Sequence, residues 1–337
     1  MHEGHADLNA SADAVPPPNS GVVPDYPDLP SAVVERTAPA AAGAVGVLGS
    51  AGAGGPAAYL SRATRSAAFD PWPDSSVHVE WGRTGAALAA ARGDVIVVVD
   101  VFSLSTTLSI AVSRDFTCLV YSGAEIESLG GPAMAALRLG ARPPSRRRKA
   151  AAGQVSLSPA SLLEAEPGQR VIFTSRNGAS VVSAASKATA VLIGSPRNAS
   201  ACAAVAAQLM TSVRAGRVTV IACGEHWSSV DPAAIGTRPA AEDWIGAGAV
   251  CAGLADLGYS LSAEARLAAA TWSHPTALPD LADCVSAREL RAAGFAADVE
   301  LALDVDADEK VPVRMAGEQT GRVFLGEAAR DESAVCG

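Results

Sequence analysis

An aspartate closes the most apolar stretch of this sequence, and hydroxyl side chains follow it. Asp100 lies at the end of a run of β-branched residues, 95–101. The hydroxyl side chains that come next are those of Ser103, Ser105, Thr106 and Thr107. A carboxylate is a hard oxygen ligand of the kind magnesium prefers, and hydroxyls and backbone N–H groups at a helix start can hold phosphoryl oxygens. The alternative is that these residues only cap a helix.

Two further apolar stretches, 171–174 and 191–194, are followed by residues that can donate hydrogen bonds to an anion. The candidates are Arg176, Asn177, Gly178, Arg197 and Asn198. Arginine and asparagine donate to anions, and glycine lets the backbone approach a ligand closely. The alternatives are an ordinary turn around Gly178 and a helix N-cap at Asn198.

Acidic residues follow the fourth apolar stretch, 218–223. Glu225 comes directly after it, next to His226, and Glu242 and Asp243 open a later stretch rich in alanine and glycine. Carboxylates at a helix start are favoured by the helix dipole alone, and a histidine beside a tryptophan can be structural. The functional interpretation makes them metal ligands or a general base. We predict Asp100, Glu225 and Asp243 as catalytic residues and Asp100, Glu242 and Asp243 as ligands of Mg²⁺.

Strands and helices must alternate to position these residues. The predicted strands are 77–81, 95–101, 118–121, 171–174, 190–193, 218–223, 299–305 and 311–315. The predicted helices are 84–92, 106–112, 158–166, 178–187, 199–213, 241–257 and 287–293. Such alternation predicts a layered α/β fold. Ligands bind at the carboxyl ends of the strands in open α/β sheets, and this is where the candidate residues fall.

The chain divides by composition into a tail and one domain. Residues 1–75 are rich in Ala, Pro, Gly and Ser, without lasting periodicity, and are expected to be disordered. Residues 76–327 form the predicted α/β domain, and residues 328–337 a flexible C-terminus. The stretch 141–154 is a predicted long loop with a basic run at 146–149. That run is either a solvated surface or an attractor of an anionic substrate.

Charge and cysteine usage exclude several classes of protein. A net charge of -9 argues against nucleic acid or an anionic membrane surface as the partner. The six cysteines form no CxxC pair and are expected to be small buried apolar residues. Neither a signal peptide nor an apolar run of membrane-spanning length is visible. A cytoplasmic protein with a small-molecule partner is expected.

Several of these segments resemble one known family, 2-phosphosulfolactate phosphatase, known from coenzyme M biosynthesis. DVFSLSTT (100–107) looks like its Asp-Val-Leu-Arg-Ala-Thr-Thr-Thr segment, and SRNGAS (175–180) like its Thr-Thr-Asn-Gly-Thr segment. IGSPRNASA (193–201) is similar to its Gly-Ser-x-x-Asn-Ala-Ser segment. CGEHW (223–227) and AEDWIGAGAV (241–250) resemble its Cys-Ala-Gly-x-x-Gly and Glu-Asp-x-x-x-Ala-Gly-Ala pair. The order and spacing of the segments also agree, from about residue 77 to residue 313.

The resemblance implies a fold peculiar to that family, a homodimer, and magnesium-dependent removal of phosphate from (2R)-phospho-3-sulfolactate. The resemblance implies that the residues at the positions of the family's active site are Asp100, Ser105, Thr106, Thr107, Asn177, Gly178, Asn198, Glu242 and Asp243.

Departures from the family pattern concern the charges around the substrate. The arginine of the first segment is Ser103 here, whereas Arg176 and Arg197 are gained. Arginines recognise acidic groups by bidentate contacts, so the phosphatase chemistry transfers better than the substrate. We predict a Mg²⁺-dependent phosphatase for a small anionic phosphomonoester, either similar to 2-phosphosulfolactate or a phosphorylated sugar or nucleoside of specialised metabolism. The alternatives are a catalytically silent binding protein and a lyase or transferase acting on a phosphorylated acid.

Overall fold

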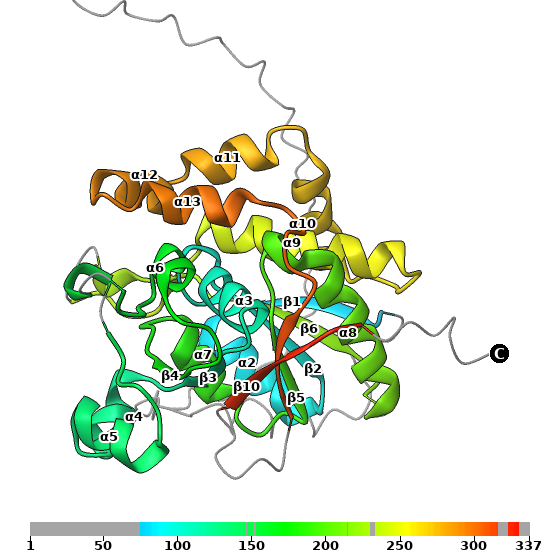
Figure 1. Ribbon diagram of the computed structural model, residues 1–337. Helices are drawn as coiled ribbons and strands as arrows, with labels where there is room; N and C mark the ends of the chain where they lie inside the picture. Colours follow the sequence, from blue (N-terminus) through cyan, green and yellow to red (C-terminus); the bar gives the residue numbers. More distant parts are fainter. Residues whose placement is uncertain are drawn as a thin grey trace, which may run out of the picture. The chain divides into compact units, whose positions relative to one another are not determined.

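The computed structural model describes residues 75–145, 147–150, 153–213, 215–229, 233–315 and 323–329. Within them, helices and strands alternate along the chain, which confirms the predicted α/β class (Figure 1). The predicted tail, 1–75, and the predicted flexible C-terminus, 328–337, lie almost entirely outside the described residues.

A mixed sheet of eight strands forms the centre, in the order β1-β6-β2-β5-β9-β10-β3-β4. Its strands are β1 (Val77–Trp81), β2 (Val95–Val99), β3 (Thr117–Val120), β4 (Arg170–Phe173), β5 (Ala190–Ile193), β6 (Val218–Ala222), β9 (Val311–Met315) and β10 (Val323–Glu327). The strands β1, β6, β2 and β5 run parallel to one another, as do β3 and β4. Between these groups, β9 and β10 pair antiparallel with their neighbours.

The sequence of β2 explains its central place. All five residues, VIVVV, are buried, and a continuous β-branched run suits a strand covered on both faces. Val95, Val97 and Val99 pack into one hydrophobic cluster, and Ile96 and Val98 pack into another. The carboxyl end of this strand is therefore held from both sides.

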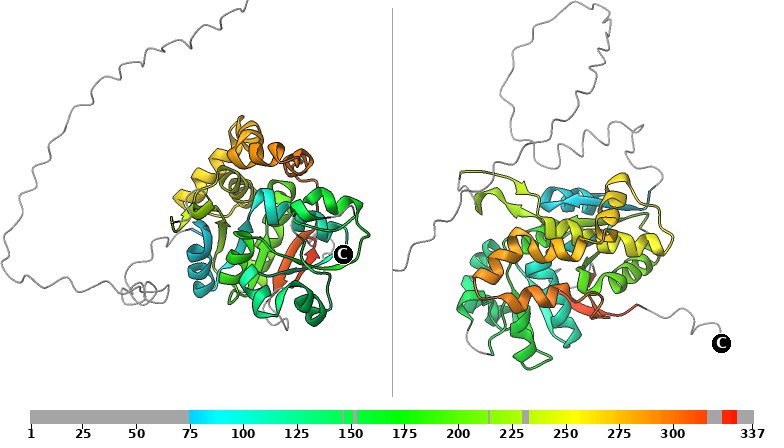
Figure 2. Two further views of the ribbon diagram at one scale, coloured as in Figure 1. Left: turned by 90° about the vertical axis from the view of Figure 1, so that its left-hand side faces the viewer. Right: turned by 90° about the horizontal axis from the view of Figure 1, so that it is seen from above.

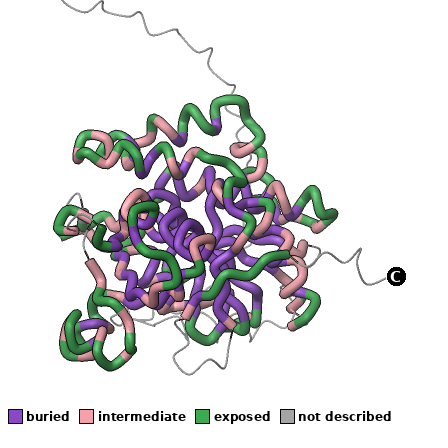
Figure 3. The backbone as a smooth tube through the Cα atoms, viewed as in Figure 1, coloured by how far each residue is buried: buried purple, intermediate pink, exposed green. Residues whose placement is uncertain are grey.

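Helices cover both faces of the sheet (Figure 2). The cluster containing Val97 includes residues of α8 (Ala199–Ser212), α9 (Ala241–Asp256) and α10 (Ala263–Ser273). The cluster containing Ile96 includes residues of α2 (Gly82–Arg92), α3 (Thr106–Ser113), α6 (Pro159–Glu164) and α7 (Gly178–Ala184). Figure 3 shows buried backbone concentrated at the sheet and exposed backbone on the outer helices.

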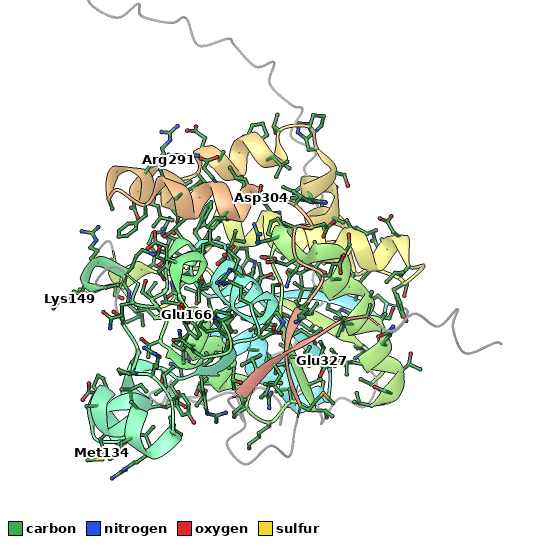
Figure 4. All side chains as sticks on the ribbon, viewed as in Figure 1. Met134, Lys149, Glu166, Arg291, Asp304 and Glu327 are labelled. Carbon is green, nitrogen blue, oxygen red and sulfur yellow. The ribbon has the colours of Figure 1, made fainter. Side chains whose placement is uncertain are left out.

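Smaller helices surround this core. The pair α4 (Gly123–Ser128) and α5 (Gly131–Leu139) packs over β3 and β4, with Met134 at its exposed end (Figure 4). The helices α11 (Ala277–Asp283), α12 (Val285–Ala292) and α13 (Ala296–Leu303) pack against one another; α11 also packs against α9, and α13 against α6. A two-stranded hairpin, β7 (Glu225–His226) and β8 (Thr237–Arg238), follows β6. No helix in the described part of the chain is both long and apolar enough to cross a membrane.

One predicted strand, 299–305, is wrong. These residues belong mostly to helix α13. Val299, Leu301 and Leu303 alternate with other residues and so imitate a strand, but Asp298, Val299 and Ala302 are the buried residues, which is helical spacing. Short apolar runs fit the helical and the strand period equally well. In the sheet, β9 pairs with β5 and β10, and not with residues 299–305. The predicted loop at 141–154 contains a short 3-10 helix, Arg147–Lys149.

Candidate active site

Asp100 lies at the carboxyl end of β2, in a turn that supplies hydrogen bonds to its side chain. Ser175 Oγ and the backbone N–H of Gly178 donate to Asp100 Oδ2 at 3.0 and 3.1 Å. The backbone N–H of Leu104 also donates to this carboxylate. Gly178 has to be glycine because an added Cβ would collide with Asp100 Oδ2. The turn after β4 and the end of β2 therefore meet at one carboxylate.

A π-helical turn, Val101–Ser105, makes the Leu104 contact available. The N–H of Ser105 bonds to the Asp100 carbonyl at 2.8 Å, five residues back along the chain. In an α-helix, the N–H of Leu104 would bond to that carbonyl. The wider turn leaves the N–H of Leu104 for the side chain of Asp100. Single π-turns within helices are frequent at functional sites.

The hydroxyl groups behind Asp100 hold this turn in shape. Ser105 Oγ accepts from the N–H of Asp100, Thr106 Oγ1 donates to the carbonyl of Val101, and Thr107 Oγ1 donates to the carbonyl of Ser103. All three hydroxyl-bearing residues, Ser105, Thr106 and Thr107, are buried. In this structure they bind the backbone. Ser103 is half-buried, at the surface of the turn.

Asp243 ties the ends of two neighbouring strands to helix α9. Its Oδ1 accepts from the N–H of Val101 at 2.9 Å, and its Oδ2 accepts from the N–H of Gly224 at 2.8 Å. Val101 follows β2 and Gly224 follows β6, so one carboxylate in the first turn of α9 fixes both. This contact brings the second predicted carboxylate to the same edge as Asp100.

Asn177 and Glu225 join the site from the ends of β4 and β6. Asn177 Nδ2 donates to Glu225 Oε2 at 2.8 Å, and both residues line a small cavity beside Gly224. The other amide oxygen, Asn177 Oδ1, is buried without a hydrogen-bond partner in the described structure. Buried polar atoms without a partner are costly, so this oxygen is suited to a bound cation or a ligand donor.

These carboxylates repel one another. Burial, opposed by the hydrogen bond from Ser175 and reinforced by the charge of Glu225, raises the pKa of Asp100 to about 6. Burial, the charge of Asp100 and the charge of Glu242 raise the pKa of Asp243 well above its usual range. Neither aspartate forms an ion pair with a described lysine or arginine. Negative charge that no ion pair neutralises, at a sheet edge, is what a divalent cation would relieve.

Cys223 lies among these acids and is excluded as a nucleophile. Burial and the charges of Asp100, Asp243 and Glu225 raise the pKa of its thiol well above the ordinary value. The thiolate is the reactive form, so this cysteine stays protonated and inert.

Comparison with known proteins identifies the family. The family model described as 2-phosphosulpholactate phosphatase matches residues 85–317. The chain belongs to the 2-phosphosulpholactate phosphatase family. It is thus a phosphatase, which hydrolyses phosphoric monoesters. A comparison with curated proteins finds no match.

The residues gained relative to the family segments lie apart from the carboxylates. Arg176 is exposed, directly before Asn177. Arg197 is directed toward α13 and the residues after it, where it pairs with Asp304 and Asp308 at 3.0 and 2.7 Å. Asp304 is labelled in Figure 4 at the end of α13.

Two predicted residues of the family pattern make local structural contacts. Asn198 is buried, and its Oδ1 accepts from the N–H of Ser195 at 2.9 Å, across the first turn of the 3-10 helix Pro196–Asn198. Its side chain makes no cap hydrogen bond to α8, so the expected N-cap role is wrong. Glu242 is buried and accepts from the hydroxyl of Ser286 in α12. The structure therefore brings Asp100, Asn177, Gly178, Glu225 and Asp243 together, while Arg197 and Asn198 bind elsewhere.

Three residues near the site were not predicted as part of it. Ser175 donates to Asp100, and its place directly before Arg176 at a strand end was an available signal. Arg147 donates to the carbonyl of Phe102 at 2.7 Å, whereas the basic run at 146–149 is interpreted first as a solvated loop. Asp298 pairs with Arg147 at 3.3 Å and lies directly before the stretch mistaken for a strand, in the same helix α13.

Proposed function

We propose that this phosphatase is magnesium-dependent and hydrolyses the phosphomonoester of a small anionic metabolite. The observation that carries the proposal is Asp100, a buried carboxylate that faces Asp243 and Glu225 with no described lysine or arginine in ion-pair contact. The substrate is either similar to 2-phosphosulfolactate or a phosphorylated sugar or nucleoside.

The donor set fits magnesium in its usual protein mode. The described residues contain no group of three or more His, Cys, Asp or Glu side chains that could hold a metal ion by themselves. Magnesium usually keeps several waters and takes only one or two carboxylates together with substrate phosphate. Asp100 and Asp243 would supply the carboxylates, and Asn177 Oδ1, a buried oxygen without a hydrogen-bond partner in the described structure, would be a further ligand. Glu242, which is bonded to Ser286, is the alternative to Asp243.

When bound, the ion supplies a Lewis acid that withdraws electron density from the phosphoryl group. Glu225 acts on the nucleophile: its carboxylate is half-buried beside the cavity and held by Asn177, so it can take the proton of a water molecule. The water oxygen forms the new bond to phosphorus and the ester P–O bond breaks. The departing alkoxide takes a proton from solvent, and Glu225 returns to solvent the proton that it accepted. Ser105, Thr106 and Thr107 keep the Asp100 turn in shape.

Substrate contacts are assigned to the residues that remain accessible at this edge. Ser103 is half-buried, Arg176 is exposed, and Asn177 lines the cavity. Gly178 is buried, and its N–H holds Asp100 instead. Arg197 and Asn198 shape the neighbouring segment through their bonds to Asp308 and Ser195. The binding site thus uses the turn after β4 more than the turn after β5.

Release of inorganic phosphate from a panel of phosphomonoesters tests the proposal. We expect turnover of at least one acidic phosphoester with Mg²⁺ and its loss with a chelator. Binding without turnover would instead select a silent binding protein, and an organic product without free phosphate would select a lyase or transferase. Full activity in the chelator would overturn the role of the metal.

A cytoplasmic location and a homodimer complete the proposal. The five described cysteines are all free, four of them buried, which suits a reducing compartment. The homodimer rests on the family resemblance, and sedimentation of the purified protein tests it.

A further inference from the structure

Arg147 comes from the basic run of the long loop and reaches the edge of the sheet that carries Asp100. Its Nη2 donates to the carbonyl of Phe102 at 2.7 Å, two residues after Asp100. Its guanidinium also interacts electrostatically with the carboxylate of Asp100. The neighbouring Arg148 and Lys149 are exposed, and Lys149 projects from the periphery in Figure 4.

The guanidinium of Arg147 is fixed on several sides. Nη2 and Nε donate to the carbonyl of Leu157 at 2.7 and 3.2 Å. Nε lies 3.3 Å from Asp298 Oδ2, and the guanidinium packs over the ring of Phe295, 5.5 Å from its centroid. The side chain of Arg147 is only 16% exposed. An arginine held in this way loses little conformational freedom when it binds a ligand.

Asp298 is itself held in place. Its Oδ1 accepts from the hydroxyl of Ser158 and from the N–H of Ala160 at the start of α6. Helix α13 thus positions Arg147 through Asp298 and Phe295, and the same aspartate anchors the segment that carries Leu157.

One edge of the guanidinium remains available. Nη1 has no hydrogen-bond partner among the described residues. It is not one of the buried side-chain atoms without a partner, so it reaches solvent. Burial lowers the pKa of Arg147 more than Asp298 and Asp100 raise it, so its positive charge would gain from a further anion. An arginine with a purely structural role would need no accessible Nη1.

We propose that Nη1 of Arg147 binds an anionic oxygen group of the substrate, and that Asp298 is the residue that positions it. This assignment rests on the proposed function and places a cation beside the turn where Ser103 stands in place of the family's arginine. Two sources share the chemistry: the phosphoryl group, or a second acidic group of the same metabolite. Planar guanidinium donors match the oxygens of both.

Binding of two non-hydrolysable probes separates these sources. Methylphosphonate carries only a phosphoryl-like group, and phosphonoacetate carries a carboxylate as well. Calorimetric titrations with Mg²⁺ would compare the wild-type protein, Arg147→Gln and the control Arg148→Gln, whose parent side chain is exposed. Since no turnover is needed, failure of the phosphatase proposal would appear separately, in the phosphate-release assay.

We expect Arg147→Gln to weaken binding about tenfold or more, the effect of losing a charge-assisted hydrogen bond. Weakening with both probes would assign Arg147 to the phosphoryl group, and weakening with phosphonoacetate alone would assign it to a second acidic group. Affinities equal to those of Arg148→Gln would overturn the proposal, as would a wild-type protein that binds neither probe at millimolar concentration. If Arg147→Gln fails to fold, Arg147→Lys carries the same test, because it keeps the charge but lacks the second nitrogen of the fork.

Discussion

The two ends of strand β2 carry one buried aspartate each, and their surroundings are opposite. Asp94, before the strand, accepts from Nε and Nη2 of Arg92 and from the hydroxyl of Thr219. Asp100, after the strand, accepts from a hydroxyl and backbone N–H groups and faces other carboxylates. Both residues are less than 10% exposed. Removing the partner of a paired buried carboxylate destabilises a fold, whereas a buried carboxylate without an ion-pair partner is tolerated where its charge has a use.

The largest expected effect comes from Asp100→Asn. The amide is nearly isosteric but carries no charge for a cation, so we expect turnover to fall on the order of 100-fold or more and the dependence on Mg²⁺ to weaken. Steady-state phosphate release measures this, with Asp94→Asn as the control at the other end of the strand. Full turnover in Asp100→Asn would mean that Asp100 only caps the turn.

The raised pKa of Asp100 makes its contribution to stability and to metal binding depend on pH. Its folded-state pKa of about 6 lies above that of an exposed aspartate, about 3.9. The folded state therefore binds a proton that the unfolded chain has released, and the contribution of Asp100 to stability is lost as pH rises from about 4 through about 6. Metal binding, and with it turnover, should rise over the upper part of this range.

Denaturant unfolding of wild type and Asp100→Asn from pH 5 to 8, in chelator, measures the stability side. We expect the free energy of unfolding of the variant to increase relative to that of wild type as pH increases, so that the variant is at least as stable as wild type at pH 7. A constant difference between them would remove Asp100 as the titrating group.

Asp94→Asn should have the opposite effect. Loss of the charged partner of Arg92 is expected to lower the free energy of unfolding by about 1–3 kcal/mol, reduced by the 22% exposure of the Arg92 side chain. Turnover per folded molecule should stay unchanged. Denaturant midpoints and phosphate release report the two quantities separately, and a large loss of turnover would show that the two ends of β2 are not independent.

The smallest effect is expected from Arg176→Ala. The residue is exposed, so folding should not change, and any loss should appear in KM, up to about tenfold if the guanidinium contacts substrate. The free energy of unfolding serves as the control. Unchanged KM and kcat would show that Arg176 does not contact the substrate, and Arg147 would then be the arginine proposed to do so.

Much of the fold and part of the site followed from local patterns. The β-branched run before Asp100 predicts a buried strand because few other structures accommodate it, and carboxyl ends of parallel strands meet, so Asp100 and Glu225 were expected near one another. Long-range partners were not predictable. Arg197 pairs with Asp308, 111 positions along the chain, and no local pattern distinguishes an arginine bound to such a partner from one that faces a ligand.

Helix α13 shows the other limit. Its apolar residues fit a strand as well as a helix, so Asp298 and Phe295 could not be placed, and the fixed position of Arg147 could not be inferred from a basic run alone. Strand β10 and helices α10 and α11 were missed as well, since their burial depends on neighbours distant in the sequence.

The π-turn at Val101–Ser105 makes the number of residues in this segment a property of the site in its own right. Removing one residue between Asp100 and Ser105 would make Ser105 the fourth residue after Asp100, convert the π-turn to an α-turn, and rotate the following residues about the helix axis by about 100° relative to Asp100. Substitution is a milder change: DVFSLSTT differs from the family's segment at several positions, Ser103 among them, but both have eight residues. The number of residues between Asp100 and Thr107 is therefore expected to be fixed. A one-residue deletion in this segment should yield a protein that is folded, as measured by circular dichroism, but no longer releases phosphate.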